Sequence, residues 1–91
     1  MGIGDEKDRL ERIFRSVEAW VDLQLSSAKA KSRDEAFLKT LRDYVAQSLR
    51  SLSTARKQRD LPRLERRANK ATAAAISYVQ RTLSERKMED R

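Results

Sequence analysis

Apolar residues recur every three or four positions along most of the 91-residue chain, which places them on one side of an α-helix. In the first segment, residues 5–29, Asp5 stands at the start, where the helix dipole favours negative charge. With Leu23 included, the apolar arc covers about 200°, whereas one neighbouring helix needs only about 100°. We therefore expect this helix to touch two neighbours or a second subunit. Its apolar residues are Ile3, Leu10, Ile13, Phe14, Val17, Trp20, Val21, Leu25 and Ala28.

The second segment, residues 33–57, begins at a predicted capping box, in which Ser32 is the N-cap and Glu35 reaches back to it. The run before it, residues 28–31, has no large apolar residue, so we expect the first helix to end there. The small Ser48 lies near the centre of the apolar face. The other residues on that face are Phe37, Leu38, Leu41, Tyr44, Val45, Leu49, Leu52 and Ala55.

The third segment, residues 61–87, follows a break near Arg56 to Asp60. That break is predicted because Asp60 can cap a helix and Pro62 is tolerated only in a first turn. Alanines fill the middle of the inward face, where they either let another backbone come close or simply favour the helix. The inward residues are predicted to be Leu61, Leu64, Ala68, Ala71, Ala75, Ile76, Tyr78, Val79 and Leu83.

Three helices with short connections predict an all-α fold, an antiparallel up-down-up three-helix bundle in one domain, residues 1–91. Each helix would span about 24–27 residues, or about 36–40 Å, and residues 1–4 and 88–91 would fray. The chain has two glycines and one proline, too few for the turns of a β-rich fold. In the alternative architecture the first break is itself helical, and a long helical hairpin dimerises into a bundle.

The chain has no histidine and no cysteine, which excludes Ser-His-Asp and Cys-His arrangements and Cys/His zinc sites. Glu18 and Asp22 lie one turn apart, but on the polar side of the first helix, as solvated charge. We therefore predict a protein that is not an enzyme and has no catalytic residues, cofactor, metal or small-molecule substrate. The lack of cysteine, of a leader pattern and of an apolar run of about 18–20 residues predicts a cytoplasmic location.

A protein partner is the expected ligand, and its predicted binding residues, Ile13, Trp20 and Leu23, lie on the first helix. Trp20, Tyr44 and Tyr78 all lie on apolar arcs, so core packing is the simplest interpretation of these aromatic residues. Trp20, however, is at the edge of its arc and Leu23 lies beyond it, which is typical of a buried interface. We predict a small interaction, adaptor or regulatory protein that also forms a homo-oligomer, with a homodimer as the simplest case.

Basic residues are concentrated between Arg56 and Lys70, a region called the basic block below. The whole chain has 21 basic and 14 acidic residues and a net charge of +7. Positive charge in the first turns of a helix is disfavoured by about 0.3–1 kcal/mol per residue, so nearby acids or an anionic ligand should offset it. The candidate anion-binding or nucleic-acid-binding residues are Arg56, Lys57, Arg59, Arg63, Arg66, Arg67 and Lys70.

Two explanations of the basic block remain open. In an antiparallel bundle the first and third helices start at the same end, so Asp5, Glu6, Asp8 and Glu11 could neutralise part of the block. An anionic ligand is the other explanation, which makes a nucleic-acid-binding accessory protein the alternative function, with an anionic membrane surface ranked after it. The residues predicted to project away from the apolar side of the third helix are Arg59, Arg63, Arg66, Arg67, Lys70 and Arg81.

Overall fold

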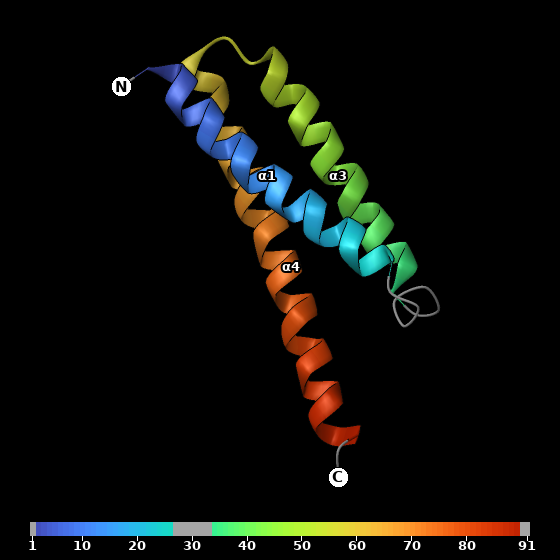
Figure 1. Cartoon of the computed structure of the whole chain (residues 1–91). Coiled ribbons are helices and arrows are strands. Elements are labelled where there is room, and N and C mark those ends of the chain that lie inside the picture. The colour runs from blue at the N-terminus through green and yellow to red at the C-terminus, as the bar shows by residue number, and fades with distance from the viewer. Residues whose placement is uncertain (1, 27–33, 90–91) are drawn as a thin grey trace.

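The computed structural model describes residues 2–26 and 34–89, with side chains through residue 85. Its elements are α1 (Ile3–Leu25), α3 (Glu35–Thr54), the 3-10 helix η1 (Gln58–Asp60) and α4 (Leu61–Glu89). α1 and α4 run in one direction and α3 in the other, and each of the three α-helices contacts both of the others (Figure 1). The prediction of an all-α, antiparallel three-helix bundle is confirmed.

α1 and α3 are separate helices that pack side by side. At one end the Lys7 ammonium donates a hydrogen bond to the Ala55 carbonyl at 2.9 Å, and at the other the Arg42 guanidinium pairs with the Asp22 carboxylate at 3.2 Å. Residues 3–54 therefore do not form one continuous helix. The alternative of a long helical hairpin is wrong.

α3 begins two residues later than predicted. It starts at Glu35 with Asp34 at the N-cap, so Glu35 is not the third helical residue of a capping box. Ser32, the predicted cap, lies outside the described residues. The Asp34 carboxylate makes no capping hydrogen bond, and instead accepts one from the Arg81 guanidinium of α4 at 3.1 Å. A contact with another helix, rather than a local cap, thus holds the start of α3.

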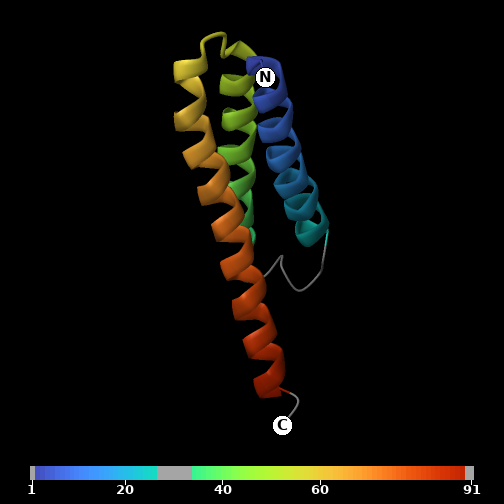
Figure 2. The same cartoon turned by 90° about the vertical axis from the view of Figure 1, so that its left-hand side faces the viewer.

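The three α-helices differ in length more than predicted, with 23, 20 and 29 residues in chain order. α1 begins and ends earlier than the predicted range 5–29, and α3 ends before the predicted residue 57. At 1.5 Å per residue, α4 is about 44 Å long and α3 only about 30 Å. The second half of α4 consequently extends past the ends of α1 and α3 (Figure 2).

All three α-helices contribute to one core. Leu10, Phe14 and Val21 of α1 are completely buried, as are Leu38 and Val45 of α3. Full burial of such a side chain contributes about 1.5–3 kcal/mol, so these five are major sources of stability. The other buried apolar residues are Val17, Leu41, Leu52, Ala55, Leu61, Leu64, Ala68, Ala71 and Tyr78.

Three residues of α4 that were predicted to point inward are exposed instead. Ile76 is 51% exposed, Val79 is 39% exposed and Leu83 is 53% exposed. In the same stretch Tyr78 is buried against Trp20 of α1 and Phe37 of α3. The neighbouring helices therefore cover the Tyr78 side of α4 and leave these three side chains exposed. Phe37, predicted on the apolar face of α3, is also 40% exposed.

Candidate functional site

An uncharged apolar face is formed where α1 ends beside the second half of α4. A groove of about 280 Å³ is lined there by Trp20 of α1 and by Ala75, Ile76, Val79 and Gln80 of α4. Leu23, 69% exposed, lies one turn beyond Trp20, and Leu83 lies one turn beyond Val79. We define the uncharged face by its large side chains, Trp20, Leu23, Ile76, Val79 and Leu83.

Two charged residues near this face are turned toward α3. Ten consecutive residues of α4, 71–80, carry no charge. Asp22, next to Leu23 in the sequence, pairs with Arg42 of α3, and Arg81, which follows the uncharged run, pairs with Asp34. The charges of Asp22 and Arg81 are therefore paired with α3 and not directed at the apolar side chains.

Aromatic packing fixes the position of Trp20, which lines the groove. The rings of Trp20 and Tyr78 meet edge to face with centroids 5.4 Å apart, and Phe37 stacks on Tyr78 at 5.9 Å. The Arg81 guanidinium lies 5.6 Å from the centre of the Tyr78 ring. Burial raises the pKa of the Tyr78 hydroxyl above its ordinary value of 10.0, and the negative charge of Asp34 raises it further.

The structure brings together two of the three predicted protein-binding residues. Trp20 lines the groove and Leu23 lies beside it, whereas Ile13 packs against the core and does not line the groove. The sequence prediction missed Ile76 and Val79, which were assigned to the core. The charge-free run on α4 was the available signal for them.

The basic block forms a second feature, at the start of α4. A cleft of about 620 Å³ lies between the end of α3 and the start of α4, and we call it the basic cleft. Arg56 and Lys57 are exposed just before η1 and do not line it. Lys70 is exposed further along α4, 6.0 Å from the centre of the Tyr44 ring. The residues that line the basic cleft are Ser51, Thr54, Ala55, Arg59, Asp60, Pro62, Arg63, Leu64, Arg66 and Arg67.

Arg67 does not project away from the bundle, as was predicted. Its Nε donates a hydrogen bond to the Ser48 hydroxyl of α3 at 2.8 Å, and its guanidinium lies 4.1 Å from the centre of the Tyr44 ring. Ser48 is completely buried and donates its own proton to the Tyr44 carbonyl at 2.8 Å. Arg81 likewise faces α3, through Asp34. The prediction for both arginines was wrong, because their long side chains turn back toward α3.

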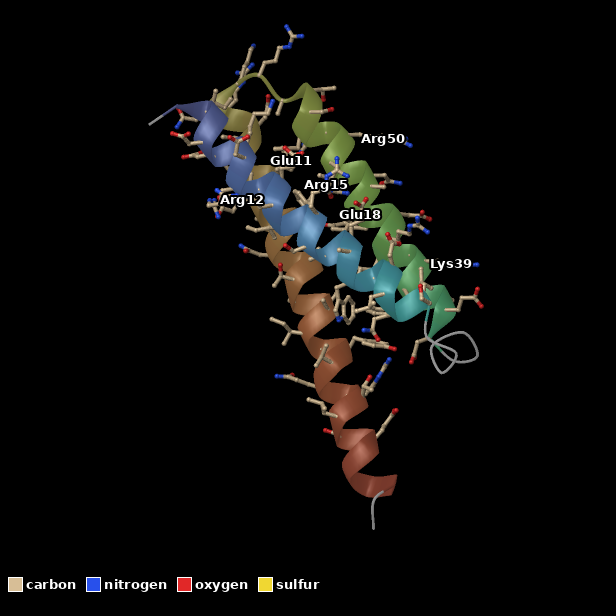
Figure 3. All side chains as sticks on the ribbon, viewed as in Figure 1. Glu11, Arg12, Arg15, Glu18, Lys39 and Arg50 are labelled. Carbon is tan, nitrogen blue, oxygen red and sulfur yellow. The ribbon has the colours of Figure 1, made fainter. Side chains whose placement is uncertain are left out.

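The acids of α1 that were predicted to neutralise the basic block form no ion pair with it among the described residues. The ion pair that joins the starts of α1 and α4 instead has its cation on α1 and its acid on α4, with Arg9 and Glu65 at 2.8 Å. Glu6 and Arg66 border the same shallow depression of about 380 Å³ without forming an ion pair. Glu11 is engaged within α1, by Arg15 at 3.8 Å, and Arg15 also pairs with Glu18 (Figure 3).

Most of the basic block thus has no anionic partner within the described part of the chain. No hydrogen bond or ion pair to another described side chain is formed by Arg56, Lys57, Arg59, Arg63 or Arg66. Like charges one turn apart on a helix repel each other, so Arg63 and Arg66 in the first turns of α4 raise the free energy of the folded state. An anionic ligand would relieve that repulsion.

Residues 2–26 and 34–85 contain no group of three or more acidic side chains placed to hold a metal ion. No helix in the same part of the chain is both long enough and apolar enough to cross a membrane. No family model, curated protein or solved structure gives a significant match to the chain. Its function is therefore inferred from its own residues.

Proposed function

We propose that the chain is a non-enzymatic interaction module that self-associates, with the uncharged face of a second copy covering its own. The uncharged run at residues 71–80 is the observation that supports this most directly. Charged residues make up 38% of the chain, so ten neutral residues in succession on a helix that leaves its bundle need a separate explanation. Depletion of charge is the compositional mark of the centre of a protein interface.

The spacing of the exposed side chains fits a helical partner. Ile76, Val79 and Leu83 follow one another at intervals of three and four residues, the a and d positions of a heptad that pack against another helix. Ala75 and Trp20 line the groove beside them. Because alanine is small, a second helix can approach α4 closely at that point.

The charge distribution favours a second copy in antiparallel orientation. A twofold interface is formed by the same surface patch on both copies, which a neutral patch tolerates and a patch of one charge does not. Parallel pairing of two α4 helices would place the two basic blocks side by side. In antiparallel pairing about Val79, each Arg63 lies about 24 Å from the centre, so the two blocks are separated by several Debye lengths of about 8 Å.

The exposed area sets the expected affinity. Covering the exposed half of an aliphatic or aromatic side chain contributes about 1 kcal/mol, so the five side chains of the uncharged face in two copies contribute about 10 kcal/mol. Loss of translational and rotational freedom on association costs at least about 4 kcal/mol. The expected dimer is weak, with a Kd on the order of 10⁻⁴ M.

Analytical ultracentrifugation from about 10 µM to 1 mM tests this proposal, because the range spans a Kd on the order of 10⁻⁴ M. The wild-type protein should shift from monomer to dimer, and Val79→Glu should remain a monomer because its carboxylate would be buried against its own copy. Gln47→Glu is the matched control, since Gln47 is exposed on α3 and the variant adds the same charge. A wild-type protein that stays monomeric, or a Val79→Glu variant that dimerises equally well, contradicts the proposal.

A further inference from the structure

We infer that the basic cleft binds the phosphodiester backbone of nucleic acid. Its lining includes four guanidinium groups, those of Arg59, Arg63, Arg66 and Arg67, against the single carboxylate of Asp60. Arg67 is already held by α3, so the other three arginines are the ones available to a ligand. Arginine is suited to this role because its planar guanidinium donates two parallel hydrogen bonds to the oxygens of one phosphate.

The arrangement of the cations fits a chain of phosphates better than a single one. Arg63, Arg66 and Lys70 follow each other along α4 at intervals of about one turn, or about 5.4 Å. Arg56 and Lys57 extend the same positive region beyond η1, outside the basic cleft. One phosphate group could engage only two or three of these side chains, whereas a linear polyanion can run along all of them.

The positions of the exposed apolar residues argue against a membrane as the anionic surface. Helices that bind anionic lipid insert apolar side chains beside their cations. In the described part of the chain the exposed large apolar residues are on α1, the start of α3 and the second half of α4, and none of them lines the basic cleft. Leu64, the one large apolar residue in the lining, is 3% exposed. The exposed large apolar residues are Leu23, Phe37, Ile76, Val79 and Leu83.

The lining also predicts how nucleic acid is recognised. It contains no aromatic residue on which a base could stack, and Tyr44, the nearest ring to Arg67, is covered by that guanidinium at 4.1 Å. Contacts to phosphate position a protein on nucleic acid but carry no sequence information. Binding should therefore be independent of sequence and strongly dependent on salt.

Fluorescence anisotropy with a labelled DNA duplex of about 20 base pairs, titrated between about 50 and 200 mM salt, tests the inference. Contacts from the six cations along which the polyanion runs, Arg56, Lys57, Arg59, Arg63, Arg66 and Lys70, predict an affinity that falls about 2,000-fold over this range. The triple variant Arg59→Ala, Arg63→Ala, Arg66→Ala keeps three of these contacts, so its affinity should fall only about 40-fold. The variant should fold normally, because it removes positive charge from the start of α4, where the helix dipole disfavours it.

Arg12→Ala combined with Lys39→Ala is the control for lost positive charge, and it removes two charges where the triple variant removes three. These two side chains project from the outer sides of α1 and α3, away from the basic cleft (Figure 3). The control should keep most of the steep salt dependence. Equal salt dependence in the triple variant and the control, or no DNA binding at about 50 mM salt, overturns the inference. Binding to phosphatidylserine vesicles that is lost in the triple variant, without DNA binding, assigns the cleft to lipid and also overturns it.

The inference is independent of the proposed self-association. The uncharged face and the basic cleft share no residue, and Val79→Glu leaves every residue of the cleft in place. DNA binding by a monomeric Val79→Glu variant would support the basic cleft. It would do so even if the wild-type protein formed no dimer.

Discussion

Arg67 is predicted to stabilise the fold, whereas its neighbour Arg63 is predicted to destabilise it, although both belong to the basic block. Arg67 crosses from α4 to α3, where it donates to the Ser48 hydroxyl at 2.8 Å and covers the ring of Tyr44. Arg63 is exposed in the first turn of α4 and has no hydrogen bond or ion pair to another described side chain. Replacing each by alanine should change the free energy of unfolding in opposite directions.

The magnitude for Arg67→Ala comes from three contributions. The hydrogen bond from a charged donor is worth about 1.5–3 kcal/mol, and the contact with the Tyr44 ring about 0.5–1 kcal/mol. Relief of repulsion with Arg63 and Lys70, four and three residues away, returns about 0.2–0.5 kcal/mol for each pair. Ser48 still donates to the Tyr44 carbonyl in the variant, so its proton keeps a partner. We expect a net loss of about 2 kcal/mol.

Urea and thermal unfolding, followed by circular dichroism at one fixed protein concentration, measure the effect. Arg67→Ala should lower the Tm by about 8–16 °C in a domain of this size, and Arg63→Ala should leave it unchanged or raise it. Arg67→Lys keeps the charge but loses the planar group that lies over Tyr44, so it should recover less than half of the loss. Equal Tm values for Arg67→Ala and Arg63→Ala would refute this account of the basic block.

Two further predictions concern the core and the aromatic packing beside the groove. Phe14 is completely buried, so Phe14→Ala should lower the free energy of unfolding by about 3–5 kcal/mol. Leu23 is 69% exposed, so Leu23→Ala should lower it by less than about 0.5 kcal/mol. Equal losses in urea unfolding would contradict these placements. The pKa of Tyr78 is raised by burial and by Asp34, so its contribution to stability is complete below pH 10.0 and decreases as the pH rises toward its folded pKa. Unfolding measured from pH 9 upward should show a steeper fall for the wild type than for Tyr78→Phe, and parallel curves would argue against the shift.

The sequence predicted the fold well because hydrophobic periodicity reports which side of a helix is apolar. Leu10, Phe14 and Val21 were assigned to one face of the first helix, and all three are completely buried. The break before α4 was predicted from Pro62, and α4 indeed begins at Leu61. These features depend on residues close together in the sequence, where spacing and backbone preferences are sufficient.

The sequence could not show whether an apolar side of a helix is covered. Ile76 and Val79 have the correct spacing for a core, but their burial depends on where α1 and α3 end and on the direction in which α4 leaves them. The contact of Arg67 could not be predicted for the same reason. The position of Arg67 on the helix predicts the direction of its side chain. The hydrogen bond to Ser48 also depends on the distance between α3 and α4, which the sequence does not give.

The two proposed surfaces are linked through α4, whose first turns carry the basic cleft and whose second half carries the uncharged face. In an antiparallel dimer centred near Val79 the two basic clefts would lie about 50 Å apart, at opposite ends of the paired helices. A short duplex could then occupy only one cleft, whereas a longer nucleic acid could reach both. Two linked sites raise the apparent affinity through effective concentration without any new contact. A dimer too weak to matter at low concentration would in this way be stabilised by a long nucleic acid, because each cleft that binds the same molecule brings the two uncharged faces together.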